Sequence, residues 1–180
     1  MAFRLPQQEE KVGTYMEDPE FEWLIQNRLV AGQSEAQTNR VWIMILTDIF
    51  KRANGYSTGS EMTFGDGRAD LFTAHVVVRT RHKEMKFLIV ECKPPNQEGQ
   101  DEVWETAAKQ LHGYLMAIAS PNRKFGAISV RKYVRFYELV DDEYSVDCKG
   151  DGNVYRLDRQ CQSVTAKLLY FQSHHLPAQF

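Results

Sequence analysis

The stretch EMKFLIVECKPP, from Glu84 to Pro95, carries the strongest fold signal in the chain. Four large apolar residues in succession, Phe87 to Val90, are typical of a strand that is buried on both faces in the middle of a sheet. The two prolines end the strand, because proline cannot donate a backbone hydrogen bond to a neighbouring strand. We therefore expect a central strand from Glu84 to Lys93.

The end of this strand carries an acid and a base. Side chains alternate along a strand, so Glu91 and Lys93 share one face and Cys92 points to the other. Charged groups are rarely buried unless they are paired or bind a metal ion, so packing explains these two charges poorly. The structural alternative is a surface ion pair on an edge strand.

The apolar run before the central strand supplies a second carboxylate. Residues 69–80 predict a strand, and the polar residues 81–83 predict the turn that joins the two strands. Such a hairpin would bring Asp70 beside Glu91. Two carboxylates at one point form an oxygen site suited to Mg²⁺ or Mn²⁺, and the backbone carbonyl of Cys92 would add a ligand. A strand-start cap is the alternative for Asp70.

Apolar residues spaced three and four positions apart predict four helices around these strands. The first begins at Asp18-Pro19 and ends at Gly32, and Ser34 caps the second. His174-His175, after the last helix, is expected to lie in a mobile tail. The three later helices are expected at 34–53, 101–119 and 161–172.

Shorter patterns complete the expected fold. Residues 125–130 and 133–140 predict a hairpin, and 154–157 predict a short strand. Residues 56–67 and 141–153 predict loops, the first of them with a short strand. This order of helices and strands indicates an α/β domain with a mixed central β-sheet flanked by helices.

The composition supports one globular domain. The chain has 180 residues, of which 43% are hydrophobic and 26% charged, and this excludes a disordered chain, a collagen-like fibre and a disulfide scaffold. We expect a loose N-terminal arm at 1–16 and a single domain at 17–180. Three cysteines without paired spacing indicate reduced thiols in an intracellular protein, and we expect neither a signal peptide nor a membrane partner.

The helix after the central strand contributes a further pair of polar residues. Gln110 and Tyr114 are four positions apart, so they share one face of that helix. Asp70, the Glu91-Cys92-Lys93 stretch and this Gln-x-x-x-Tyr pair together resemble the PD-(D/E)XK nucleases, the restriction-endonuclease-like superfamily. The Gln-x-x-x-Tyr pair is similar to a motif of the RecB-type branch of that superfamily.

The resemblance covers about residues 34–140 and implies a restriction-endonuclease-like core. It departs at Ala69, which stands where the superfamily carries its name-giving proline. The first core helix of these nucleases often supplies an acid, for which Glu35 is the natural candidate. A capping acid near a helix N-terminus is the alternative for Glu35.

The resemblance also implies metal-dependent hydrolysis of a phosphodiester bond. Asp70 and Glu91 would hold Mg²⁺ or Mn²⁺, which would polarise the phosphoryl group and lower the pKa of a bound water. Lys93 would orient that water or stabilise the developing charge, and Glu35 would hold a second ion or a water. The Gln-x-x-x-Tyr pair would position the phosphate or the Lys93 side chain by hydrogen bonds; an ordinary helix-face pair is the alternative.

A basic stretch without acids runs from Ser120 to Tyr137. Arg131, Tyr133 and Arg135 fall on one face of the strand expected there, and basic residues interleaved with aromatic ones suit phosphate contact and base stacking. A solvated strand face is the alternative. Because the net charge is −2, nucleic-acid binding requires such a local basic surface.

The leading hypothesis is therefore a metal-dependent nuclease, with DNA favoured over RNA as its substrate. The alternative is a catalytically idle nuclease-fold module that binds nucleic acid or a protein partner, which the negative net charge favours. In a third hypothesis, a homodimer or a partner subunit supplies the missing basic surface. Its interface would then be the apolar face of the first helix, which carries Phe21, Trp23 and Leu24.

Overall fold

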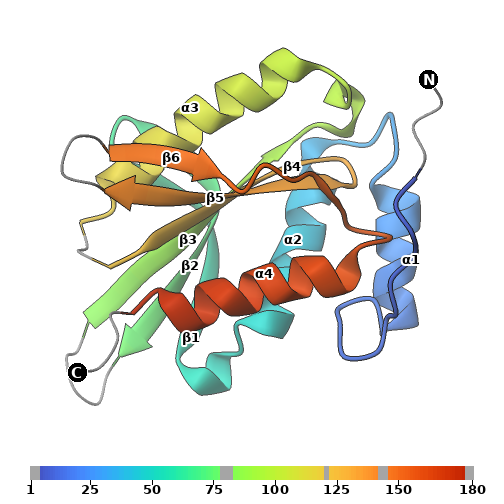
Figure 1. Cartoon of the computed structure of the whole chain (residues 1–180), viewed down its shortest axis with the longest axis horizontal. Helices are drawn as coiled ribbons and strands as arrows, with labels where there is room; N and C mark the ends of the chain where they lie inside the picture. The colour runs from blue at the N-terminus through green and yellow to red at the C-terminus, as the bar shows by residue number, and fades with distance from the viewer. Residues whose placement is uncertain (1–4, 78–82, 120–121, 142–145, 177–180) are drawn as a thin grey trace.

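The computed structural model describes residues 5–77, 83–119, 122–141 and 146–176, and these residues form a seven-stranded mixed sheet (Figure 1). The strands are β1 (Tyr56–Phe64), β2 (Gly67–Val77), β3 (Lys83–Lys93), β4 (Lys124–Val130), β5 (Tyr133–Asp141), β6 (Val146–Gly150) and β7 (Tyr155–Arg156). Their order is β1-β2-β3-β4-β5-β6, and β7 also pairs with β5. β3 and β4 are parallel, whereas the other neighbouring strands are antiparallel.

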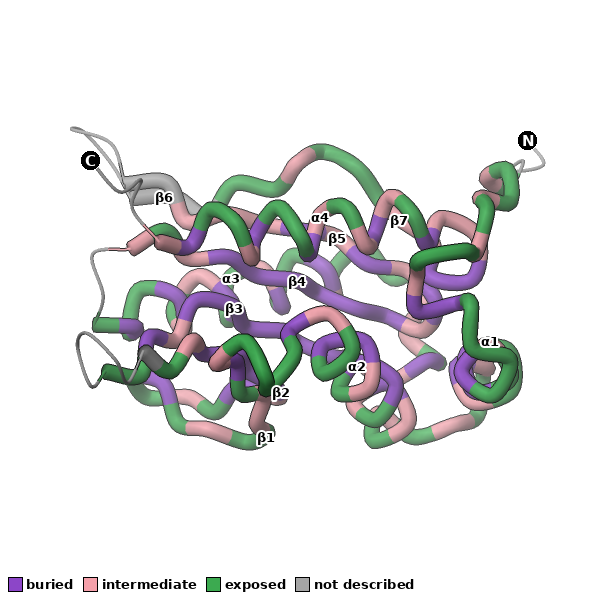
Figure 2. The backbone as a smooth tube through the Cα atoms, turned by 90° about the horizontal axis from the view of Figure 1, so that it is seen from below, coloured by how far each residue is buried: buried purple, intermediate pink, exposed green. Residues whose placement is uncertain are grey.

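Helices cover both faces of this sheet. In the described residues they are α1 (Pro19–Arg28), α2 (Glu35–Ile49), α3 (Asp101–Ala117) and α4 (Cys161–His174), with 3-10 turns at Arg52–Asn54 and Pro95–Gln97. Helix α3 packs on one face, α2 and α4 pack on the other, and α1 lies beside α2 at one end (Figures 1 and 2). Within this part of the chain, no helix has both the length and the apolar character that crossing a bilayer requires.

Each helical layer forms its own apolar cluster with the sheet. Leu111 of α3 belongs to the same cluster as Ile89, and Trp42 of α2 lies with Leu88 on the opposite face. β3 is buried on both faces and has a neighbour on each side, which confirms the predicted central strand through Phe87–Val90. The parallel β3–β4 pair needs a crossover connection, and α3 provides it.

Two strands lie where the sequence predicts loops. β1 occupies most of the segment predicted as a loop with a short strand, and β6 lies inside the predicted acidic loop. Both lie at the edges of the main sheet order, where one side of a strand meets solvent and polar residues are tolerated. β1 is rich in serine, threonine and glycine, and the hydroxyls of Thr58 and Thr73 lie 3.1 Å apart across the β1–β2 pair. These two strands are defined by backbone hydrogen bonds to β2 and β5. Such pairing requires no run of apolar residues, so the sequence does not reveal them.

Helix α2 is shorter than predicted. It ends at Ile49, four residues before the expected end at Ala53, and a 3-10 turn follows at Arg52–Asn54. Gly55 adopts a left-handed φ of 86°, so this stop signal ends the 3-10 turn and not the helix. Ser34 stands at the N-cap position, but its side chain makes no capping hydrogen bond.

The described part of the N-terminal segment corrects the expectation of a loose arm. The backbone N–H of Glu9 donates to the carbonyl of Arg159, and the Glu9 side chain accepts a 2.9 Å hydrogen bond from the backbone of Ser163. Further along, Tyr15 is buried and its hydroxyl donates to the carbonyl of Leu157 at 2.9 Å. The segment therefore packs on the start of α4. Tyr15 is part of the apolar cluster on this side of the sheet, and its burial favours this packing.

The end of α4 corrects the expectation of a mobile histidine tail. His174 is the last residue of the helix, and His175 is 1% exposed. The Nε2 atom of His175 lies 3.0 Å from Nδ1 of His75, and its ring stacks on Phe87. An aromatic cage from the first three strands therefore holds the end of this helix, and Tyr56 completes it.

Candidate active site

The hairpin of β2 and β3 brings the two predicted carboxylates together. Leu71 pairs with Val90, so Asp70 and Glu91 occupy the next facing positions on the two strands. Oδ2 of Asp70 accepts a 2.8 Å hydrogen bond from the backbone N–H of Cys92, and Oε1 of Glu91 lies 3.4 Å from the backbone N of Asp70. Each carboxylate is thus held by the backbone of the strand that carries the other.

Lys93 completes the charged end of β3. Its Nζ atom lies 3.4 Å from Oε2 of Glu91 and 3.1 Å from Oε1 of Gln110 on α3. Glu91 is 2% exposed and lies on a central strand, so the alternative of a surface ion pair on an edge strand is wrong. Cys92 is buried on the opposite face, as the alternation predicts.

The two residues of the Gln-x-x-x-Tyr pair make different contacts. Gln110 reaches Lys93, whereas Tyr114 packs against the start of β2. Its ring lies so close to Gly67 that a Cβ atom there would come within 2.4 Å of it. Tyr114 therefore supports the strand that carries Asp70, and within the described residues it makes no hydrogen bond to Lys93.

Glu35 lies at the beginning of α2 and borders a cleft beside Lys93. The cleft has a volume of about 430 Å³. The Glu35 carboxylate is close enough to Asp70 and Lys93 for their charges to influence its pKa. The polar lining of the cleft consists mainly of three glutamines, two glutamates and one lysine, which are Gln97, Gln100, Gln110, Glu35, Glu102 and Lys93.

The acids at this site are shifted toward their protonated forms. Burial, with the charge of Asp70 added, raises the pKa of Glu91 to about 7, although Lys93 opposes the shift. Burial is also the main cause that raises the pKa of Asp70, and burial with the Asp70 charge raises that of Glu35. One lysine therefore does not compensate the negative charge of the three carboxylates.

This imbalance fits a divalent cation. Asp70 and Glu91 offer adjacent carboxylate oxygens, the ligands that Mg²⁺ and Mn²⁺ prefer. Nowhere in the described residues do three histidine, cysteine, aspartate or glutamate side chains form a metal-holding group. The two acids would therefore supply two ligands, with the rest from backbone, water or substrate, as Mg²⁺ allows. The Cys92 carbonyl as a ligand stays a prediction.

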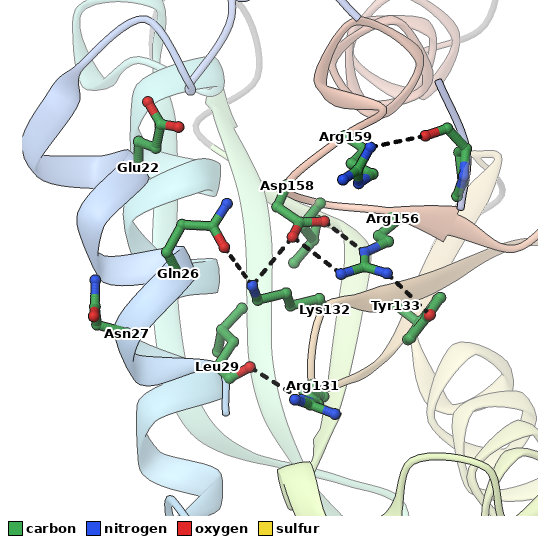
Figure 3. A network of polar contacts seen from close by, with 12 residues as sticks. Glu22, Gln26, Asn27, Leu29, Arg131, Lys132, Tyr133, Arg156, Asp158 and Arg159 are labelled. Atoms are coloured by element: carbon green, nitrogen blue, oxygen red, sulfur yellow. Dashed lines mark hydrogen bonds and ion pairs between the residues drawn. The ribbon is translucent and has the colours of Figure 1, made fainter. Parts of the chain in front are cut away.

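The structure does not place all three predicted nucleic-acid-binding residues, Arg131, Tyr133 and Arg135, on one strand face. Arg131 lies in the two-residue turn between β4 and β5 with a φ of 55°, so it is not on the strand face that Tyr133 and Arg135 share. Its guanidinium donates to the carbonyl of Leu29 at 3.3 Å (Figure 3). It also donates to the carboxylate of Glu98. Strand alternation does not extend through a tight turn, and for this reason the sequence argument misplaced Arg131.

Tyr133 and Arg135 also have partners within the protein. The Arg135 guanidinium lies 4.4 Å above the Trp104 ring of α3, and the Tyr133 hydroxyl accepts from Nη1 of Arg156 at 3.4 Å. The contact of these residues with nucleic acid remains a prediction.

A buried polar network beside this turn escaped the sequence argument. Nζ of Lys132 donates to Oε1 of Gln26 at 2.5 Å and to Oδ2 of Asp158 at 3.1 Å, and Asp158 also pairs with Arg156 (Figure 3). The network joins α1, the β4–β5 turn and the segment before α4. The only sequence signal was a lysine in a tight turn, which normally indicates a solvent-exposed residue.

The sequence also gave no signal for Glu98 or for the cleft glutamines Gln97 and Gln100. They lie in the connection between β3 and α3, and their importance depends on what that connection faces. No protein-family model matches this chain, and a comparison with curated proteins finds no relative. The geometry of the site is therefore the basis for assigning a function.

Proposed function

We propose that this chain is a metal-dependent nuclease with a restriction-endonuclease-like core, which hydrolyses phosphodiester bonds in DNA. One observation carries the proposal: Asp70 and Glu91 lie together, each held by the other's strand, with Lys93 beside them. Burial leaves these carboxylates short of positive charge, and a divalent cation would supply it. We infer Mg²⁺ or Mn²⁺ as the cofactor.

The arrangement of elements around the pair supports the same proposal. Three antiparallel strands follow α2, and α3 then leads to the parallel strand β4. This order agrees with the nuclease resemblance, which covers about residues 34–140. The beginning of α2 also brings Glu35 within electrostatic reach of Asp70, as expected for an acid from the first core helix.

Each side chain would have a separate task in hydrolysis. Asp70 and Glu91 would hold the cation, which when bound polarises the phosphoryl group and lowers the pKa of water. Lys93 would stabilise the negative charge that develops on the phosphate. Because Gln110 accepts a hydrogen bond from the Lys93 ammonium group, it would keep that charge aimed at the substrate.

Glu35 and Tyr114 would act around this centre. Glu35 borders the cleft within electrostatic reach of Asp70 and Lys93, and it would hold a second ion or a metal-bound water there. Tyr114 would be a positioning residue, because it packs on Gly67 at the start of the strand that carries Asp70.

A catalytically idle module is the second candidate, and the pairing of nearby cations favours it. Arg68 is paired with Glu61 at 2.9 Å, and Arg131 with Glu98. Both arginines would therefore bind phosphate only after their ion pairs break. A partner subunit or a second copy of the chain would then supply basic surface. Trp23 of α1 is 51% exposed and suits such an interface, whereas Phe21 and Leu24 are buried and do not.

Cleavage assays separate the two candidates. Labelled single- and double-stranded DNA and RNA are incubated with Mg²⁺, Mn²⁺ or EDTA, using wild type, Asp70→Asn and Lys93→Ala. Lys109→Ala is the matched control, because Lys109 is an exposed lysine on α3, one residue before Gln110. We expect metal-dependent cutting by wild type and the control alone.

Two results would count against a nuclease. Equal cutting by wild type and Lys93→Ala would mean that another site, or a contaminant, performs the reaction. Tight nucleic-acid binding by folded wild type without cutting in either metal would favour the idle module.

A further inference from the structure

The cleft beside Lys93 has an unusual lining for a nucleic-acid-binding site. Lys93 is its one cation among the described residues, and Glu35 and Glu102 contribute two negative charges. Neutral amides dominate the rest of its polar wall. A surface that follows the backbone of a long nucleic acid needs several lysine or arginine side chains, because each phosphate contact neutralises one negative charge of the backbone.

The amide groups of this wall are available to a ligand. The side chains of Gln97 and Gln100 make no hydrogen bond with the described residues. Gln110 gives its oxygen to Lys93, and its two N–H donors have no partner within the same part of the chain. Glutamine amides combine a donor and an acceptor, which is the pattern that pairs with a nucleobase edge.

Two arginines near the site, one on β2 before Asp70 and one bound to the residue after Gln97, are already paired with acids. Arg68 is bound to Glu61 through both its side chain and the Glu61 carbonyl, and Arg131 is bound to Glu98 and the Leu29 carbonyl. The cleft itself has a volume of about 430 Å³, within the range of pockets that take small ligands. Its size and its charge both indicate a ligand with few phosphates.

We propose that this cleft binds one unpaired nucleotide, so that the substrate class is a short single-stranded oligonucleotide or a frayed strand end. The glutamine amides bind the base edge, and Lys93 contacts the phosphate next to it. A base that remained paired in a duplex would keep its Watson–Crick edge occupied and could not offer it to these amides. This inference rests on the proposed function, because it places the base beside the proposed catalytic lysine.

The test measures binding and its salt dependence. The full chain is titrated with a fluorescent single-stranded tetranucleotide carrying non-cleavable phosphorothioate linkages, and with a duplex of the same chemistry, in Ca²⁺ and again in EDTA. We expect the single strand to bind more tightly than the duplex. The slope of log K against log salt should be near −1, since about −0.7 is expected for each phosphate contact on a single strand.

Glutamine variants test the base contact. Gln97→Ala and Gln100→Ala should each weaken binding by about three- to tenfold, the range for loss of one or two neutral hydrogen bonds. Gln162→Ala is the matched control, since Gln162 is an exposed glutamine on α4, outside the cleft. Its affinity should equal that of wild type.

The outcomes separate this inference from the proposed function. Metal-dependent cutting with tighter binding to the duplex, or with a slope of about −5 or steeper, would overturn the inference and leave the nuclease intact. Binding of the single strand with a shallow slope and without cutting would support the inference while the proposed function fails. Absence of binding to the tetranucleotide, or glutamine variants that bind like wild type, would overturn it in either case.

Discussion

Replacing Glu91 by glutamine should stabilise the metal-free protein at and above neutral pH. Burial, and then the neighbouring Asp70, raise the pKa of Glu91 from 4.5 to about 7. Each pH unit between the unfolded and folded values corresponds to about 1.4 kcal/mol. The ionised carboxylate therefore costs the folded state about 3 kcal/mol at about pH 8, and Glu91→Gln should recover most of this.

The sign follows from the protons bound in each state. Between pH 4.5 and about 7 the folded protein keeps a proton on Glu91 that the unfolded chain has released. The contribution of Glu91 to the free energy of unfolding should therefore fall as the pH rises through this window, and its full cost should be present above it. The carboxylate of Asp70 has the same direction of shift, so its contribution adds to the trend.

Urea unfolding in EDTA, followed by tryptophan fluorescence at about pH 5 and about pH 8, measures this difference. Trp42 and Trp104 are buried, so their emission should change on unfolding. The control is Glu102→Gln, an exposed glutamate on the cleft wall, which should alter the free energy of unfolding by no more than about 0.5 kcal/mol at either pH.

Adding Mg²⁺ should reverse the ranking at about pH 8, because the cation stabilises wild type and has lost a ligand in Glu91→Gln. Equal free energies of unfolding for wild type and Glu91→Gln at both pH values in EDTA would refute the reasoning. The buried carboxylate would then carry no electrostatic cost, and the case for a cation at this site would lose its physical basis.

Three further substitutions test other parts of the structure by urea or thermal unfolding. Gly67→Ala should destabilise the fold by about 1 to 3 kcal/mol, because its Cβ would meet the Tyr114 ring at 2.4 Å; an unchanged unfolding midpoint would show that the ring moves freely. Lys132→Met should lower the free energy of unfolding by about 3 kcal/mol, because it leaves the buried Asp158 with one cation fewer. An unchanged free energy would show that Arg156 alone compensates the charge of Asp158. Burial lowers the pKa of His175, so the contribution of this histidine to the free energy of unfolding should decrease as the pH falls below about 6.5, opposite in sign to the contribution of Glu91. His175→Phe should lose less, and identical pH profiles would exclude this histidine as the cause.

The centre of the fold could be predicted because its signals are local. The apolar run of β3 and the prolines after it define a strand without reference to the rest of the chain. Alternation then fixes the faces of Glu91 and Cys92, and antiparallel pairing with the preceding strand brings Asp70 to the same point, although most of the predicted turn at 81–83 lies outside the described residues. Each of these steps depends on residues close in sequence, and each agrees with the structure.

The parts that could not be predicted depend on distant partners. Arg131 is held by Glu98, 33 residues away, and His75 meets His175 across 100 residues. Nothing in the residues around either position indicates its partner. The edge strands were missed for a different reason, because backbone pairing with β2 and β5 stabilises them and their side chains show no apolar pattern.

Cys92 links the hydrophobic core to the proposed catalytic centre through a single residue. Its side chain lies in the cluster that α2 forms with the sheet, while its backbone N–H holds Asp70. A substitution that repacks Trp42 or Ile45 could therefore shift that backbone group without unfolding the protein. Random mutagenesis scored by cleavage should recover α2 core positions among its inactive variants, and their defect would lie in the placement of one amide.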